Sequence, residues 1–150
     1  MRKEFDRTAW ISILAAAPLA ELEEYWETIP HPKFQWIRQP ELGGVMLRGQ
    51  VGGSGTIFNV GEATVTRSTL QIETGEIGVA YVLGRSMRHS ALAAMYDALM
   101  QREQSVGGEA VSLFISRLAD LSAEEKQKTL TDTYRSKVDF FMYGQEGATR

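Results

Sequence analysis

The sequence predicts an α+β fold, in which N-terminal and C-terminal helices flank a mostly antiparallel sheet of about four or five strands. Apolar residues recur at helical intervals near both ends of the chain, whereas the middle alternates in the manner of strands. The links between the predicted strands are too short for parallel crossovers. With 150 residues, the chain is long enough for one domain, 1–150, and too short to expect two.

Two helices are predicted before the sheet. The first runs from Phe5 to Ala17, and Pro18 is well placed to open a second helix that ends near Glu27. The apolar stripes of these helices are Trp10, Ile13, Leu14 and Ala17, then Leu22, Tyr25 and Trp26.

The first half of the predicted sheet contains two strands and a loop. Residues 33–38 lie between prolines and suit an edge strand. Val45, Leu47 and Val51 alternate with polar or flexible residues, which predicts a half-buried strand. This strand leads into a loop that contains Gly52, Gly53 and Gly55.

The second half is predicted to contain a short return strand, a long strand and a hairpin. Residues 57–60 form the return strand, Gly61 acts as a break, and residues 63–72 form a long strand whose buried face changes along its length. Thr74-Gly75 indicates a hairpin turn, and a last strand follows through Val79, Tyr81 and Leu83.

Three helices are predicted after the sheet. Ser86 is a suitable cap for the first, which carries Asp97 on a face expected to meet solvent or an interface. A short helix follows around residues 110–119, and Ser122 with Glu125 resembles a capping box that opens the last helix. The tail, about 144–150, is expected to be disordered.

The composition excludes several classes of function. Sixteen Lys and Arg residues against 19 Asp and Glu residues give a net charge of −3, so no basic excess indicates nucleic-acid binding. The sequence contains no cysteine, and its two histidines, His31 and His89, lack the spacing of metal ligands. No apolar segment is long enough to cross a membrane. We therefore expect a cytoplasmic protein with no metal or cofactor of its own.

The corner between the last strand and the helix after it is a candidate anion site. Free amides and the helix dipole at Gly84 and Ser86 favour negative charge, and Arg85 adds a guanidinium that matches phosphate or phosphonate oxygens. The alternative is an ordinary capped helix with a surface arginine.

Two further side chains have both a functional and a structural interpretation. His89 shares a helical stripe with apolar residues, so a structural imidazole is favoured over a general acid or base. Arg67 needs an anion if it is buried, either a carboxylate such as Glu62 or a ligand.

Two regions are candidate contacts with other proteins. The loop of Gly52, Gly53 and Gly55 resembles a phosphate cradle in composition, but it lacks the lysine of a P-loop and suits a partner contact equally well. The apolar end of the chain around Phe140 and Phe141 favours a subunit interface over core packing alone.

Taken together, these motifs resemble the PhnG family of the bacterial carbon–phosphorus lyase system. The resemblance extends over nearly the whole chain, from the Trp10 helix to the Phe140-Phe141 end. The segments that carry it are Gly52-Gly53-Ser54-Gly55, Gly61-Glu62-Ala63-Thr64-Val65-Thr66-Arg67, Gly84-Arg85 with His89, Asp97-Ala98-Leu99-Met100, and Ser136-Lys137-Val138-Asp139-Phe140-Phe141.

The resemblance implies a subunit of a cytoplasmic complex that degrades organophosphonates. Its implied partners are PhnH, PhnI and PhnJ, together with ATPase-like proteins of the PhnK and PhnL types. The complex would replace the adenine of ATP with an alkylphosphonate. The resemblance implies that nucleosidase chemistry belongs to PhnI, and that the iron–sulfur cluster and S-adenosylmethionine belong to PhnJ.

Two hypotheses for the function follow. In the first, the chain contributes Gly84, Arg85 and His89 to an anionic pocket at a subunit boundary of a transferase. In the second, it is a non-catalytic subunit that only assembles and stabilises the complex. A standalone small-molecule-binding domain ranks third.

Overall fold

The structure, a computed structural model, describes residues 4–146 and the side chains of residues 4–132. Three strands form one sheet in the order β1-β2-β3, and both strand pairs are antiparallel. The elements are α1 (Arg7–Ala16), α2 (Leu19–Trp26), β1 (Phe34–Gln50), the 3-10 turn η1 (Val51–Gly53), β2 (Ile57–Ile72), β3 (Ile77–Leu83), α3 (Met87–Val106) and α4 (Ala110–Glu146).

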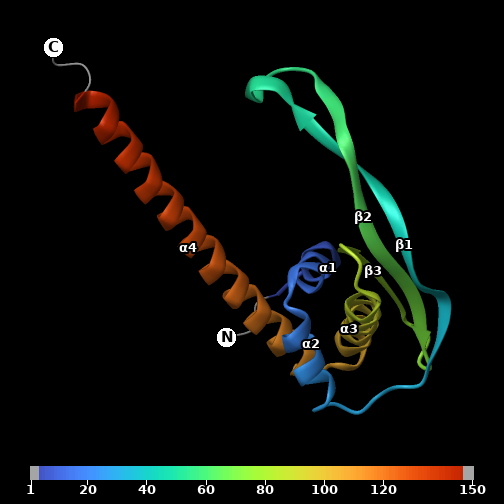
Figure 1. Ribbon diagram of the computed structural model, residues 1–150. Helices are drawn as coiled ribbons and strands as arrows, with labels where there is room; N and C mark the ends of the chain where they lie inside the picture. The colour runs from blue at the N-terminus through green and yellow to red at the C-terminus, as the bar shows by residue number, and fades with distance from the viewer. Residues whose placement is uncertain (1–3, 147–150) are drawn as a thin grey trace.

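Helix α3 lies at the centre of the molecule. One side of it covers the sheet, and α1, α2 and the beginning of α4 pack on the other side (Figure 1). Ala94 and Ala98 of α3 are fully buried, and Gly78 of β3 is so close that an added Cβ would meet the Ala94 carbonyl oxygen at 1.8 Å. Small residues at this contact therefore let the helix approach the sheet backbone.

The α+β class is confirmed, but the sheet has three strands, so the prediction of four or five was wrong. Residues 34–38 and 45–50 of the two predicted segments belong to a single strand, β1, which continues through Pro40 at the sheet edge. Similarly, 57–60 and 63–72 belong to β2, which continues through Gly61. Register shifts between β1 and β2 absorb the irregular residues without ending either strand.

The prediction of two separate C-terminal helices was also wrong. Ser122 and Glu125 lie inside α4, which runs without a break from Ala110 to Glu146. Ser122 therefore caps nothing, because the chain is already helical before it. The last residues of the predicted disordered tail, 147–150, lie outside the described residues, and that prediction stays untested.

Other local predictions are confirmed. Pro18 precedes α2, Ser86 caps α3 with its side chain, and Gly75 adopts a φ of 106° in the turn between β2 and β3. Val65 and Thr66 are adjacent in β2 and both buried, which is the predicted change of buried face.

Two long elements project from the body on the same side (Figure 1). One is the far part of the β1–β2 hairpin, residues 43–64, which we call the arm. The other is α4, whose described side chains from Ala123 to Asp132 are all exposed. The predicted half-buried strand at Val45, Leu47 and Val51 lies in the arm and at its tip, where Leu47 is 47% and Val51 64% exposed, because no helix covers this region.

Candidate functional site

The strand-to-helix corner is held by a side chain from the neighbouring strand. Gly84 has a φ of 94°, and its N–H donates to the Thr64 carbonyl at 2.9 Å. The Thr66 hydroxyl donates to the Gly84 carbonyl at 2.7 Å and accepts from the Ser86 N–H at 3.0 Å. The Ser86 hydroxyl in turn accepts from the His89 N–H at 3.3 Å.

These bonds use the amides that the anion-site hypothesis required. The N–H groups of Gly84, Ser86 and His89 all have partners within the chain. Arg85 is exposed, and within the described part of the chain its side chain has no hydrogen bond or ion pair. The corner is therefore a capped helix start with one unpartnered guanidinium beside it.

The side chains of His89 and Arg67 each have a partner within the chain. The imidazole of His89 is buried, and its Nε2 lies 2.9 Å from the Leu14 carbonyl oxygen. Because a carbonyl only accepts, Nε2 carries the proton, and the ring ties α3 to α1. Arg67 Nε lies 2.9 Å from Glu41 Oε1, so its carboxylate partner is Glu41 and not the predicted Glu62.

The most highly connected polar group is one that sequence reasoning placed wrongly. Asp97 is fully buried, whereas it was expected to face solvent or an interface. Its carboxylate accepts from Arg7 Nε at 3.2 Å and Nη2 at 2.9 Å, from Trp10 Nε1 at 2.8 Å and from the Val79 N–H at 2.9 Å.

This cluster links α1, α3 and β3. The hydrogen bond to Asp97 raises the pKa of Arg7 above its usual value. The signal available in the sequence was a single acidic residue in a stretch of α3 that is otherwise apolar. Its two side-chain partners are 87 and 90 positions away, and nothing local indicates them.

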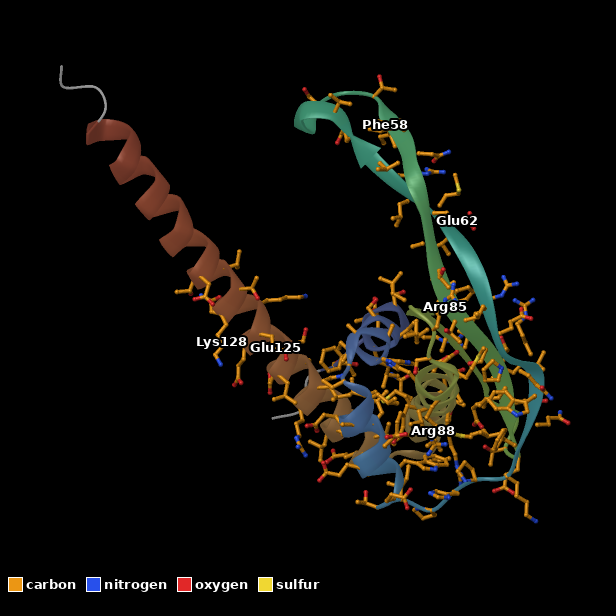
Figure 2. All side chains as sticks on the ribbon, viewed as in Figure 1. Phe58, Glu62, Arg85, Arg88, Glu125 and Lys128 are labelled. Atoms are coloured by element: carbon orange, nitrogen blue, oxygen red, sulfur yellow. The ribbon has the colours of Figure 1, made fainter. Side chains whose placement is uncertain are left out.

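The arm exposes a set of large apolar side chains. Val60 is 61% exposed and Phe58 48% exposed, and an added Cβ at Gly49 would meet both, so these residues share one face. Figure 2 shows Phe58 near the tip of the arm and Glu62 farther down, both beyond the helices that cover the sheet. The exposed apolar residues of the arm and its tip are Met46, Leu47, Val51, Ile57, Phe58 and Val60.

The glycine loop forms the tip of this arm. Gly52 and Gly53 have φ values of 62° and 75°, and the Gly55 N–H donates to the Val51 carbonyl at 2.8 Å. The loop is therefore a tight chain reversal at the end of a hairpin. The other predicted contact, Phe140 and Phe141, lies outside the residues whose side chains are described.

Two surface hollows occur elsewhere, and neither gathers the predicted residues. A cavity of about 310 Å³ lies between α2, α3 and α4, and its wall includes Tyr25 and Leu99. Burial raises the pKa of Tyr25, with a further contribution from Glu103. The Glu103 carboxylate already accepts from the Val111 and Ser112 amides at the start of α4, which makes its role structural.

The second hollow is an open depression of about 400 Å³ next to the turn between β2 and β3, and its wall includes Lys33 and Gln71. Within the described residues, no group of three or more His, Asp or Glu side chains is placed to hold a metal ion. No helix in that part of the chain is long and apolar enough to cross a membrane.

The fold and the exposed surface together indicate a class of protein. Every buried side-chain nitrogen or oxygen in the described part of the chain has a hydrogen-bond partner, so the core holds no polar group reserved for a substrate. A projecting arm exposes six of the sixteen large apolar side chains that are exposed in the described residues, and such a patch is typical of a protein that works within an assembly.

The comparison with known proteins supplies the family. Residues 5–144 match the family described as phosphonate metabolism protein PhnG. A curated relative from Rhizobium meliloti (strain 1021) is 40% identical over 136 residues, which cover 90% of this chain and 86% of the relative. That relative is described as alpha-D-ribose 1-methylphosphonate 5-triphosphate synthase subunit PhnG. The chain belongs to the PhnG family of phosphonate metabolism proteins, and the resemblance noted in the sequence is confirmed.

Proposed function

We propose that this chain is a non-catalytic assembly subunit of an alkylphosphonate ribose triphosphate synthase. In the overall reaction, a phosphonate oxygen bonds to C1 of the ribose of ATP, the bond from C1 to N9 of adenine breaks, and adenine leaves with a proton. The name of the relative supports this reaction class for the complex. The observation that carries the assembly role is the exposed apolar arm.

The partners follow from the same proposal. PhnH, PhnI and PhnJ would form the core with this chain, and ATPase-like proteins of the PhnK and PhnL types would associate with it. ATP would be a substrate of the complex, while the iron–sulfur cluster and S-adenosylmethionine would reside in PhnJ. The place of action would be the cytoplasm.

Adenine release by the reconstituted complex tests this function. We expect release from ATP and methylphosphonate when the chain is present, and a loss of at least about 100-fold when it is omitted, the scale expected when a catalytic site is not assembled. The isolated chain should release no adenine. Release by the isolated chain, or full release without it, would contradict the proposal.

A second candidate role rests on Arg85. Its guanidinium is exposed next to a helix start and has no partner in the described residues, so it is free to meet a phosphonate or triphosphate at a subunit boundary. In this version, the corner contributes only Arg85, because the Arg67 and His89 side chains are committed to Glu41 and Leu14.

Arg85→Ala in the assembled complex tests this second role. If Arg85 meets the substrate, transfer should fall about tenfold, the scale of one lost charge-assisted hydrogen bond, while assembly is unchanged. Arg88→Ala is the matched control, because Arg88 is a nearby exposed arginine that pairs with Glu23 at 3.4 Å. Unchanged turnover in Arg85→Ala with normal assembly would remove Arg85 from the site.

A further inference from the structure

One edge of β2 is left open along the arm. β3 pairs with β2 only from Gln71 to Val65, where Val65 lies opposite Leu83. Beyond that point the chain turns away at Gly84, whose N–H donates to the Thr64 carbonyl. Within the described residues, β2 from residue 57 to residue 63 pairs with β1 and has no strand on its other side.

The backbone of Glu62 points to this open edge. Backbone groups alternate between the two sides of a strand, and those of Thr64 face β3, so those of Glu62, two residues along, face the same way. Glu62 lies opposite Met46 of β1. Because two residues that form such a pair turn their backbone groups away from each other, the backbone groups of Met46 face the outer edge of the hairpin. The arm thus offers unpaired donors and acceptors on both sides.

The two edges differ in chemistry. Along the arm the β1 edge contains Arg48, and Arg38 and Pro40 lie nearer the body on the same strand; proline and positive charges are features that discourage strand pairing. Residues 57–64 of β2 contain no proline, lysine or arginine, and their one charge is Glu62. The Glu62 side chain lies over Gly44, and it has no ion pair or hydrogen bond in the described part of the chain.

The arm also lacks what a hairpin needs to be stable alone. A two-stranded hairpin in water is marginal without a third strand or a helix on one face. Here the apolar face carrying Phe58 and Val60 is exposed, and Gly61 has an ordinary φ and open space around the position of a Cβ. Glycine in a strand interior marks either a bulge, and a register shift does adjoin Gly61, or a place where another backbone approaches closely.

We propose that an extended segment of a neighbouring subunit of the synthase adds to the open edge of β2 at residues 57–63, antiparallel to β2 and in line with β3. The incoming strand carries apolar side chains against Phe58 and Val60 and a lysine or arginine opposite Glu62. The positive residue supplies the charge that Glu62 lacks, and the strand extends the three-stranded sheet along the arm. This inference rests on the proposed assembly function.

Hydrogen–deuterium exchange of the chain, alone and within the assembled synthase, provides the first test. In the free chain the open-edge amides of the 57–64 segment should exchange rapidly, and assembly should slow them at least about 100-fold, as expected for hydrogen-bonded strand amides. Rapid exchange in the assembled complex would overturn the inference and leave the assembly function intact. Slow exchange already present in a dimer of the isolated chain would assign the edge to a second copy and also overturn it.

A pair of proline variants provides the second test. Glu62→Pro removes the donor at the open edge, and Met46→Pro removes the matching donor at the outer edge of the same residue pair. Glu62→Pro should weaken co-purification with the other subunits at least about tenfold, whereas Met46→Pro should change it less than about threefold. Glu62→Lys should also weaken assembly, through repulsion of the incoming positive residue.

The outcomes of this second test separate the two proposals. Equal losses in the two proline variants, or normal assembly of Glu62→Pro, would overturn strand addition alone. If the wild-type chain does not assemble with the other subunits, both the inference and the proposed function fail. Thermal unfolding of each variant, measured on the isolated chain, should show that its body is folded.

Discussion

At the scale of single residues, Asp97 is the side chain with the most hydrogen bonds in the described part of the body. Its carboxylate accepts four hydrogen bonds from two separate segments, α1 and β3, and is fully buried. A buried carboxylate is costly to remove from water, and these bonds, with the charge of Arg7, offset that cost. Replacing Asp97 would leave Arg7, Trp10 and Val79 without this acceptor.

We predict that Asp97→Asn lowers the free energy of unfolding by about 1.5–3 kcal/mol, because the amide presents a donor where the site needs an acceptor and removes the counter-charge of Arg7, whose side chain is about half exposed. Urea denaturation of the isolated chain measures this. Glu23→Gln is the control, since its pair with Arg88 spans 3.4 Å with both side chains about half exposed, and it should cost no more than about 0.5 kcal/mol. A loss below about 1 kcal/mol in Asp97→Asn would refute this account of the cluster.

The residue scale also shows which parts of the candidate site the sequence could predict. The structural interpretation of His89 followed from its position in an apolar stripe, and the observed bond to Leu14 agrees with it. The partner of Arg67 could not be predicted, because strand register places Glu41 opposite it, 26 positions away. The side-chain partners of Asp97 could not be predicted either, because they lie on α1 and reach Asp97 only when α1 packs on α3.

At the scale of elements, α3 organises the body because it is covered on both sides. Tyr96 of α3 is fully buried, and its hydroxyl donates to the Leu22 carbonyl of α2 at 2.6 Å. Its ring lies 5.5 Å from that of Phe114, so it also joins the beginning of α4 to this helix. Burial raises the pKa of Tyr96 above its ordinary value.

This raised pKa gives a pH dependence of stability. The folded state holds the phenol proton more tightly than the unfolded chain, in which tyrosine has a pKa of about 10. The stabilisation is therefore complete below pH of about 10 and is lost as the pH rises above it. Urea denaturation between pH 8 and 11 should show a fall in the free energy of unfolding that is shallower in Tyr96→Phe.

Tyr96→Phe should also be less stable than the wild type at neutral pH. Tyr96→Phe leaves the Leu22 carbonyl without this donor and should lower the free energy of unfolding by about 1–2 kcal/mol at pH 7. An equally steep alkaline fall in the variant and the wild type would show that Tyr96 is not the source of the pH dependence.

Element boundaries could be predicted where local chemistry decides them. Ser86 and the Thr74-Gly75 turn act within a few residues, and both were placed correctly. Gly61 and Ser122 were wrongly taken as boundaries, since pairing with β1 carries β2 through the glycine and the preceding turns of α4 carry the helix through the serine. Merging the strands at Pro40 and Gly61 accounts for the excess of strands in the prediction.

At the scale of the whole molecule, the chain consists of a closed body and two projections. The body satisfies its own polar groups, whereas the arm exposes apolar side chains and an open strand edge, and the described side chains of α4 from Ala123 onward meet solvent. Contact with another subunit would bury the exposed apolar side chains of the arm, as the proposed assembly role requires. Membership of the PhnG family and the synthase-subunit description of the relative agree with this interpretation.

Deleting the arm tests this central claim most directly. Residues 46–62 can be replaced by Asn-Gly, since Val45 lies opposite Ala63, whose backbone groups face β1, and a two-residue turn can close such a hydrogen-bonded pair. We predict that the shortened chain unfolds within about 5 °C of the wild type, because a 1 kcal/mol change shifts the midpoint by about that amount, yet no longer co-purifies with the other synthase subunits. Normal assembly and adenine release with the shortened chain would contradict the account.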